Sequence, residues 1–429
     1  MNLKTRIRSR VMRHFAAPEY LEKSRAKARK QRKKNRQAPT VRYFHQVDDP
    51  YSHLAVQKLD QLRQRYDLPF VTHLVSPPDA AYQGSTTHFA QWAVQDAAHI
   101  ATDYGTEFAP AMPTPNAQAI GHANQTLAGH LNQADFAQVA LQLGRDLWAG
   151  NEPAQQRTRS MGEDALVQGT QLRRELGHYQ GAMFYFDGEW FWGVDRLRLL
   201  EQRLCAEGFD LIGGAPCVPE PTPMDVARPQ PDIVVEYFPS LRSPYTAVGH
   251  RRVLDLIAAT GVSVTVRPVM PMLMRGIPAP RAKQRYIITD AAREGRVHGS
   301  PLGQIVDPFG EPVKRAFALF PGAAQQGRDM AFITAYLQAA WFDGVDITNH
   351  QGLKQVAAQA GLEWHSLQQQ SQDHAWEAVL ADNLEAMSAH HLWGVPSFRV
   401  TGGNARDSYA CWGQDRIWRI ANEIARRAQ

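Results

Sequence analysis

One short pattern occurs twice in this sequence, and the repeat constrains the fold more than any other feature. A β-rich run at 41–44 is followed by Asp-Asp-Pro-Tyr at 48–51 and then by residues with helical periodicity. The same order returns with a β-rich run at 234–238, Arg-Ser-Pro-Tyr at 242–245 and another helical pattern. Each copy therefore predicts a strand, a loop and a helix.

A second pair of matched segments closes each half. Trp-Gly-Val-Asp-Arg-Leu at 192–197 matches Trp-Gly-Gln-Asp-Arg-Ile at 412–417 with an offset of 220. In the first pair, Asp49 corresponds to Ser243 with an offset of 194. Two matched pairs in the same order indicate a tandem duplication with a longer second copy.

The boundaries follow from composition. A chain of 429 residues exceeds one compact core. The prolines at 216, 219, 221, 223, 229 and 231 mark a linker over 215–231. We therefore predict a basic arm over 1–38, one domain over 39–214, and a second over 232–429.

The middle of each half is mostly helical. In the second half the periodicity is clearest at 281–296, 328–341, 351–360 and 374–390. Strands come first and last, so we expect an α/β fold in which each domain has one sheet and an α-helical insertion.

The positive charge of the chain belongs to its first residues. Residues 1–40 hold 14 of the 47 Lys and Arg but only 2 of the 42 Asp and Glu, which leaves the remainder with an excess of acids. The body thus gives no compositional reason to expect a nucleic-acid-binding surface. The arm is interpreted either as a basic helix that touches RNA, acidic lipid or an acidic partner, or as a solvated, partly disordered extension.

The three cysteines, Cys205, Cys217 and Cys411, form no Cys-x-x-Cys pair. The N-terminus lacks the apolar stretch of a secretory signal, and no apolar run reaches the roughly 18 residues of a membrane span. We therefore expect a cytoplasmic protein without structural disulfides.

A set of motifs in the second half resembles a known family. In order they are Ser243-Pro244-Tyr245, Arg267-Pro268-Val269, Asp307-Pro308, Trp393-Gly394-Val395-Pro396-Ser397-Phe398 and Trp412-Gly413-Gln414-Asp415-Arg416. Together they resemble the DsbA-like thioredoxin-fold superfamily, in its 2-hydroxychromene-2-carboxylate isomerase and kappa-class glutathione transferase branch. The resemblance implies two tandem thioredoxin-like domains and glutathione as cofactor.

Ser243 is the predicted catalytic residue, because it stands where a redox relative carries its reactive cysteine. A hydroxyl donor at a helix N-terminus stabilises a bound thiolate. Pro244 suits the first helical turn, and with Tyr245 it is predicted to contact glutathione. The alternative is that Ser243 is only a helix N-cap, worth about 1 kcal/mol.

Further contacts to glutathione are implied by the resemblance alone. Val395 and Pro396 resemble the cis-proline turn that presents backbone to the cysteinyl part of glutathione. Asp415 resembles the acidic contact to the γ-glutamyl ammonium, with Gln414 beside it, although Asp415 could instead pair with Arg416 or cap the final helix. Lys283 does not follow from the resemblance, because the family's usual loop at this point is longer and carries an Asn. With Arg281 it opens the helical insertion, and these basic residues could take the glycyl carboxylate or an acidic substrate.

The first half lacks the key residues. Asp49 replaces the serine, and aligning Phe184 with Phe398 places Ala182 at the position of Pro396. An ionised Asp49 cannot donate a hydrogen bond and would repel a thiolate. We therefore expect a first copy that is structural and mimics a homodimer partner, although a carboxylate near a helix start could also act as a base in another reaction.

The predicted function is a glutathione-dependent isomerase or transferase whose partner is a small-molecule electrophile or aromatic acid. One alternative is a non-catalytic thioredoxin-fold binding or assembly protein. The other is a thiol-disulfide oxidoreductase, which would need cysteines where the sequence has Ser-Pro-Tyr-Thr at 243–246. No metal site is predicted, because His390 and His391 have no Cys or carboxylate at ligand spacing.

Overall fold

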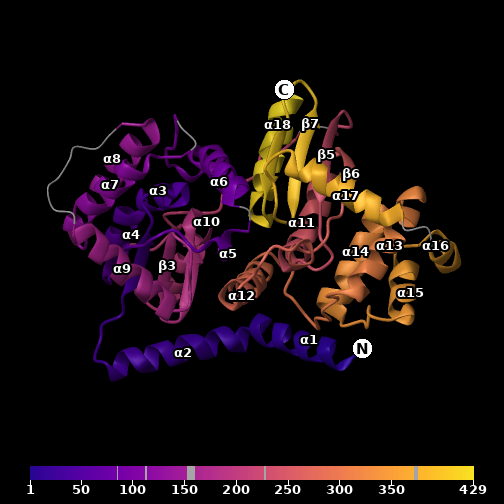
Figure 1. The fold of residues 1–429 in the computed structure, drawn as a ribbon, viewed down its shortest axis with the longest axis horizontal. Helices are drawn as coiled ribbons and strands as arrows, with labels where there is room; N and C mark the ends of the chain where they lie inside the picture. Colours follow the sequence, from indigo (N-terminus) through magenta and orange to yellow (C-terminus); the bar gives the residue numbers. More distant parts are fainter. Residues whose placement is uncertain (85, 112–113, 152–159, 227–228, 372–374) are drawn as a thin grey trace. The chain divides into compact units, whose positions relative to one another are not determined.

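The chain folds into two compact units. The computed structural model describes residues 1–84, 86–111, 114–151, 160–226, 229–371 and 375–429 (Figure 1). We call Met1–Tyr20 together with Thr222–Gln429 the C-terminal unit, and Leu21–Pro221 the N-terminal unit. No helix in these described ranges is both long and apolar enough to cross a membrane.

The sheet of the N-terminal unit has four strands in the order β2-β1-β3-β4. The strands are β1 (Val41–His45), β2 (Phe70–Leu74), β3 (Met183–Phe186) and β4 (Glu189–Trp192). β1 pairs in parallel with β2 and antiparallel with β3, and β4 completes a hairpin with β3. Side chains on both faces are buried, as expected for a sheet covered by helices.

The sheet of the C-terminal unit has the same order and the same strand directions. Its strands, in the order β6-β5-β7-β8, are β5 (Ile233–Phe238), β6 (Ser263–Val266), β7 (Ser397–Gly402) and β8 (Tyr409–Trp412). β5 pairs in parallel with β6 and antiparallel with β7, which forms a hairpin with β8. The mixed α/β fold with one sheet in each half agrees with the sequence prediction.

Helices follow the first strand, fill the interval between the parallel and antiparallel strands, and end each unit. In the N-terminal unit they are α3 (Pro50–Val56), α4 (Leu59–Arg65), α5 (Ala80–Gln83), α6 (Thr86–Ile100), η1 (Thr102–Tyr104), α7 (Ala117–His130), α8 (Phe136–Ala149), α9 (Ser160–Glu175) and α10 (Gly193–Ala206). In the C-terminal unit they are α11 (Pro244–Thr260), η2 (Met272–Arg275), α12 (Arg281–Val297), α13 (Glu311–Gln325), α14 (Asp329–Gln338), the π-helical turn η3 (Ala339–Asp343), α15 (His350–Gln359), α16 (Trp364–Gln370), α17 (Ala375–Ser388), η5 (Gln414–Arg416) and α18 (Ile417–Ala428).

The helical insertion of the C-terminal unit contains a large apolar core. Phe317, Phe332, Tyr336 and Trp341 are buried together, and the Trp341 indole N–H donates to the carbonyl of Leu241 at 3.1 Å. This bond ties the insertion to the loop that precedes α11. The four predicted helical ranges are confirmed by α12, α14, α15 and α17, although residue 374 lies outside the described residues.

Residues 1–38, predicted as a basic arm, contain two helices that are separated at Ala17. The first, α1 (Leu3–Ala16), groups with the C-terminal unit, and most of the second, α2 (Pro18–Lys34), groups with the N-terminal unit. Several of their basic side chains pair with acids of the unit to which they belong: Arg8 with Asp307, Arg25 with Glu189 and Arg32 with Asp187, at 2.7 to 2.9 Å. Part of the basic charge is therefore used inside the fold.

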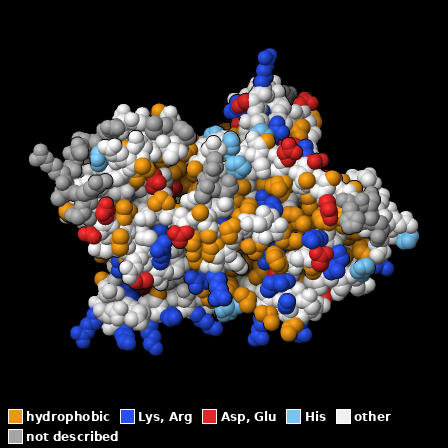
Figure 2. Space-filling model, in the orientation of Figure 1, with side chains coloured by type: hydrophobic (Ala, Val, Ile, Leu, Met, Phe, Trp, Pro, Cys, Tyr) orange, Lys and Arg blue, Asp and Glu red, His pale blue; other side chains and the backbone are white. Residues whose placement is uncertain are grey.

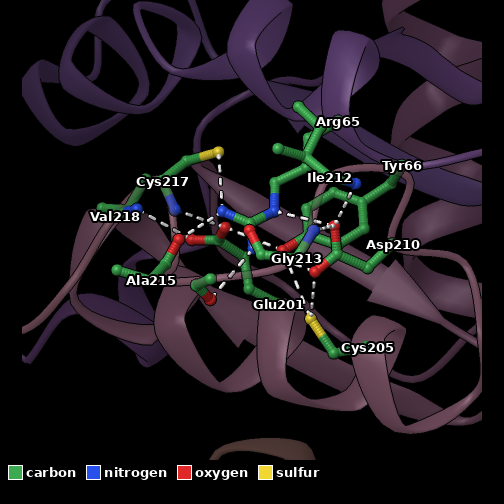
Figure 3. Close-up of polar contacts among 11 residues, drawn as sticks. Arg65, Tyr66, Glu201, Cys205, Asp210, Ile212, Gly213, Ala215, Cys217 and Val218 are labelled. Carbon is green, nitrogen blue, oxygen red and sulfur yellow. Dashed lines mark hydrogen bonds and ion pairs between the residues drawn. The ribbon is translucent and has the colours of Figure 1, made fainter.

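The beginning of the proline-rich segment is held by the N-terminal unit (Figure 3). Arg65, the last residue of α4, binds both carboxylate oxygens of Asp210 at 3.1 and 2.9 Å. It also donates to the carbonyls of Gly213, Gly214 and Ala215. Glu201 accepts from the backbone N–H groups of Cys217 and Val218 at 2.7 and 2.8 Å. Residues 213–218 are thus bound to the N-terminal unit.

Three contacts made in one unit have counterparts in the other. In the N-terminal unit they are the stacked rings of Tyr43 and Phe184, the hydrogen bond from the Tyr51 hydroxyl to Asp96 at 2.8 Å, and the bond from Gly193 N–H to Ala182 C=O at 2.8 Å. In the C-terminal unit they are the stacked rings of Tyr237 and Phe398, the hydrogen bond from the Tyr245 hydroxyl to Asp290 at 2.8 Å, and the bond from Gly413 N–H to Pro396 C=O at 2.9 Å. Tyr51 and Tyr245 are 194 positions apart in the sequence, and so are Asp96 and Asp290.

Candidate functional site

Ser243 caps the N-terminus of α11. Its hydroxyl oxygen accepts the backbone N–H of Thr246 at 3.1 Å, and Pro244 occupies the first turn, where an N–H would have no partner. The hydroxyl also lies 3.4 Å from the carbonyl oxygen of Val395, a long contact for O–H···O. The proton of Ser243 is therefore only weakly engaged, which leaves it available to another acceptor.

The segment that faces Ser243 is the turn before β7. The Val395–Pro396 peptide bond is cis, as the family resemblance implied. Val395 is half-buried, and its backbone N–H has no hydrogen-bond acceptor among the described residues. Beside the Ser243 hydroxyl there is thus one free backbone donor and one weakly used backbone acceptor.

Two tryptophans form a wall next to this turn. The rings of Trp393 and Trp412 lie 4.7 Å apart, measured between their centroids. A side chain at Gly394 would collide with the Trp412 indole, since a Cβ there would lie 2.0 Å from a ring carbon. The two Trp-Gly motifs of the sequence therefore meet in space, and Gly394 leaves room for the Trp412 indole.

Two basic side chains approach the same wall. The Lys283 ammonium nitrogen lies 5.1 Å from the centroid of the Trp393 ring, and Arg275 donates to the carbonyl of Trp393 at 2.7 Å. Burial lowers the pKa of Lys283 to about 8 and that of Arg275 to about 10. Lys283, a predicted binding residue, is thus brought to the turn that carries Val395, and Arg275 was missed because nothing in its local sequence marks it.

Tyr245, also a predicted contact residue, uses its hydroxyl inside the unit. The hydroxyl donates to Asp290 of α12 at 2.8 Å, and Arg293 donates to the same carboxylate at 2.6 Å. The equivalent Tyr51–Asp96 bond exists in the N-terminal unit, where no serine cap is present. The Tyr245 hydroxyl therefore has a structural partner that is common to both units.

Gln414 and Asp415 follow β8 in η5. The Gln414 side chain points inward, where its amide donates to the buried carboxylate of Glu294 at 2.9 Å, and its carbonyl oxygen has no partner among the described residues. Asp415 is half-buried and lies 3.7 Å from the guanidinium of Arg416. Gly413 adopts a positive φ of 118°, and a Cβ there would lie 2.3 Å from the Asp415 carboxylate. Asp415 is thus folded back over the Gly413 backbone.

The residue before Ser243 is fixed by an ion-pair cluster that sequence reasoning did not find. The guanidinium of Arg242 binds the fully buried Asp307 at 2.6 Å, and Arg8 of α1 binds the same carboxylate at 2.7 Å. Both guanidinium groups also lie over the ring of Phe309. The Asp-Pro motif at 307 was visible in the sequence, but its partner from α1 is almost 300 positions away and no local signal points to it.

Asp49, the helix cap of the N-terminal unit, is about as buried as Ser243, but the turn that faces it is more enclosed, since Gly181 is buried and Val395 only half-buried. Asp49 caps α3 by accepting the N–H groups of Tyr51 and Ser52 at 3.3 and 3.1 Å, and it also accepts the Ser52 hydroxyl at 2.8 Å. Burial raises the pKa of Asp49 to about 7. A Cβ on Gly181 would lie 3.0 Å from the Asp49 carboxylate, so the facing turn closes directly over it.

The cysteines offer no activated thiol. Cys411 is fully buried on β8. In the N-terminal unit Cys217 lies beside Arg65 and Cys205 beside Asp210 (Figure 3), and burial raises the pKa of both thiols. In the described part of the chain, no three His, Cys, Asp or Glu side chains gather in a way that could hold a metal ion.

Comparison with known proteins assigns the fold of this second half. Residues 234–425 match the family model described as DSBA-like thioredoxin domain. No match was found among curated proteins.

Several solved structures are similar to somewhat less than half of this chain. One is 2-hydroxychromene-2-carboxylate isomerase, at 17% identity, covering 45% of this chain and 95% of that one, with a TM-score of 0.38. Another is the cytosolic disulfide reductase DsbM from Pseudomonas aeruginosa, at 17% identity, covering 46% of this chain and 100% of that one, with a TM-score of 0.36. A third is the oxidoreductase DsbA from Xylella fastidiosa, at 17% identity, covering 48% and 90% of the two chains, with a TM-score of 0.29. The family match is thus confined to residues 234–425, where the chain is similar to a DSBA-like thioredoxin domain.

Proposed function

We propose that the chain is a glutathione-dependent isomerase or transferase that acts on a conjugated or aromatic small molecule. The observation that carries the proposal is the position of Ser243. Its hydroxyl sits at the N-terminus of α11 and faces the Val395–Pro396 turn, with its proton only weakly engaged. This arrangement provides a hydrogen-bond donor beside the positive end of a helix dipole.

The residues present fit a glutathione molecule. An extended peptide beside Val395 needs a backbone donor and a backbone acceptor, and Val395 offers an unpaired N–H and a carbonyl held only by a 3.4 Å contact. Lys283 supplies a cation for a carboxylate, and Asp415 a half-buried carboxylate for an ammonium group. When bound, glutathione would supply the nucleophilic sulfur that this chain lacks at position 243.

The work of the protein would be to hold a thiolate and to position its target. Ser243 would turn its proton from the Val395 carbonyl toward the sulfur, which favours the anion over the thiol. The indoles of Trp393 and Trp412 would form an apolar surface for a planar conjugated substrate, and the Arg275 and Lys283 side chains favour one that carries an acidic group. Isomerisation releases the thiol unchanged, whereas transfer leaves it attached to the product.

A thiol-disulfide oxidoreductase is disfavoured by the residues at this site. Dithiol chemistry needs a low-pKa cysteine at the helix start, and the chain has Ser243 there. Cys411 lies on the same sheet, but its side chain is buried within it. The chain therefore has no sulfur of its own placed to begin a disulfide exchange at this turn.

We further propose that the two units arose by tandem duplication and that only the second one is active. The shared strand order and the three recurring contacts support a common ancestor. Asp49 and Ala182 stand where the C-terminal unit has Ser243 and Pro396, so glutathione chemistry would occur once per chain. The N-terminal unit would replace the second subunit of a homodimer.

The test is a titration of the thiolate absorbance of bound glutathione in the full-length protein and in Ser243→Ala. We expect the thiol pKa of bound glutathione to be at least one unit lower in the native protein than in the variant. An unchanged pKa would remove the role given to Ser243, which would then be a helix cap alone.

The matched control is Asp49→Ala, which removes the corresponding helix cap from the other unit. Loss of either cap costs about 1 kcal/mol of helix stability. Only Ser243→Ala should change the thiol pKa. If calorimetry detects no glutathione binding to the native protein, the enzyme proposal fails and the non-catalytic binding or assembly module takes its place.

A further inference from the structure

Helix α1 has two apolar faces, although its unit covers only one. The covered face contains the buried residues Thr5, Ser9 and Ala16, with Met12 and Phe15 packed against the core of the C-terminal unit. The Ser9 hydroxyl accepts the backbone N–H of Asp307 at 2.9 Å, which fixes the rotation of the helix on the unit. The opposite face therefore has a defined direction.

The opposite face carries a stripe of aliphatic side chains. Leu3, Ile7 and Val11 are 70%, 55% and 47% exposed. They are spaced four residues apart, so at about 100° per residue they lie along one side of the helix, turned away from Thr5, Ser9 and Ala16. We call these three residues the outer stripe.

Basic side chains flank the outer stripe. Lys4, Arg6 and Arg10 are exposed and make no ion pair with any described residue, and residues 1–18 contain no Asp or Glu. Figure 2 shows basic side chains next to hydrophobic ones along the edge where α1 lies in Figure 1. Arg8, in contrast, is bound to Asp307 on the covered side.

We propose that the outer stripe docks the protein on a membrane surface that contains anionic lipids. A convex helix ridge of aliphatic residues with cations beside it matches a flat interface: the aliphatic side chains enter the boundary between headgroups and acyl chains, and the cations reach the phosphates and carboxylates. The charge of the three free cations selects an anionic surface over a neutral one. Because the covered face is already packed, the helix needs no refolding to bind.

The experiment is co-sedimentation of the full-length protein with vesicles of phosphatidylcholine alone and of phosphatidylcholine with phosphatidylserine. We expect binding to the anionic vesicles, and binding at least tenfold weaker to the neutral ones. Replacing Lys4, Arg6 and Arg10 together by Gln should weaken anionic binding by about 100-fold at low salt, since each cation contributes about fivefold. Leu3→Ser/Ile7→Ser/Val11→Ser should weaken it more than tenfold.

Two matched control variants distinguish vesicle binding by the outer stripe from nonspecific hydrophobic and electrostatic binding. Leu211 and Ile212 of the N-terminal unit are 64% and 73% exposed, and replacing both by Ser should leave vesicle binding unchanged. Replacing the exposed Lys27, Lys30 and Lys33 of α2 by Gln removes the same charge away from the outer stripe and should have a smaller effect than the α1 charge variant. Circular dichroism melts check that each variant stays folded.

Three results would overturn the proposal. The native protein could fail to bind either vesicle, or the Ser variant of the outer stripe could bind anionic vesicles as well as the native protein does. The third is a concentration-dependent dimer in light scattering that the Ser variant abolishes, with no vesicle binding, which would assign the outer stripe to a second copy of this chain.

Discussion

The two units present the same helix start with different chemistry. In each, a residue after the first strand caps the next helix, a residue three positions later donates its N–H to that cap, and a tyrosine two positions after the cap binds an aspartate at 2.8 Å. The cap is Asp49 in one unit and Ser243 in the other. The scaffold therefore does not need the serine, since a carboxylate caps its helix equally well.

What differs is what each cap faces. Ser243 faces a half-buried turn with an unpaired N–H, and a lysine lies near that turn. Asp49 faces Gly181, whose backbone closes over the carboxylate. A site for an anion needs a hydrogen-bond donor, and at the cap of α3 a carboxylate stands in place of the hydroxyl that caps α11.

The largest expected effect comes from moving the cap of the N-terminal unit into the C-terminal one. Ser243→Asp should still cap α11 but should lower glutathione-dependent turnover by about 1000-fold, because it replaces a donor by a like charge beside the thiolate. Steady-state kinetics with an electrophilic aromatic substrate measures the loss. The reciprocal Asp49→Ser should leave turnover unchanged, and a loss of turnover there would mean that the N-terminal unit takes part in catalysis.

The second test concerns the pH dependence of stability at Asp49. Its pKa of about 7 lies above the value near 4 expected for the unfolded chain. The folded protein therefore holds a proton that the unfolded chain loses, and stability falls as the pH rises from about 4 to 7.

Asp49→Asn removes this ionisation while keeping an acceptor for the cap. At pH 8 we expect the variant to be about 4 kcal/mol more stable than the native protein, and at pH 4 about equal to it. Urea unfolding followed by circular dichroism at the two pH values provides the measurement. Equal stability at pH 8 would show that the native carboxylate ionises without cost.

Lys283 gives a third test, in which the stability of the folded protein rises with pH instead of falling. Burial lowers its pKa to about 8, whereas an unfolded lysine titrates near 10.4. The cost of the buried charge is present below pH 8 and disappears as the pH rises toward 10.4. Lys283→Met should therefore be about 3 kcal/mol more stable than the native protein at pH 7 and equal to it above pH 10.4, while its affinity for glutathione falls. If the variant is stabilised but binds glutathione with native affinity, Lys283 does not contribute to glutathione binding.

The smallest expected effect concerns the tyrosine–aspartate hydrogen bond that is present in both units. Tyr51→Phe and Tyr245→Phe each remove one hydrogen bond to a buried aspartate, so each should cost about 1 kcal/mol in urea unfolding. Turnover should be unchanged in both. If only Tyr245→Phe lowers turnover, its hydroxyl acts on the bound glutathione as well as on Asp290.

The sequence predicted the architecture where local patterns carry it. The strand before each cap, the proline at position 244 and the helical ranges of the insertion are all set by residues close in the chain, and all appear in the structure. The Trp-Gly motifs also identified the segments that meet beside Ser243, since Gly394 and Trp412 fit one another.

Local sequence patterns could not predict the polar contacts between residues far apart in the chain. The inward turn of Gln414 onto Glu294 depends on how closely α12 approaches η5, which periodicity does not encode. The arm could not be divided between the units from composition, because a run of Arg and Lys does not say which of its members will meet an acid. Arg275 was missed for the same reason, since its single strong partner is the carbonyl of Trp393, over 100 positions away.

The pairing of Arg8 and Arg242 on one carboxylate has a practical consequence for handling the protein. Asp307 is fully buried and neutralised from two sides, so proteolysis that removes Arg8 deprives it of one cation and disturbs the loop that ends at Ser243. A shortened protein that loses activity would therefore say nothing about direct contact between its first helix and substrate. Mass spectrometry that shows Arg8 to be present should therefore accompany every activity assay.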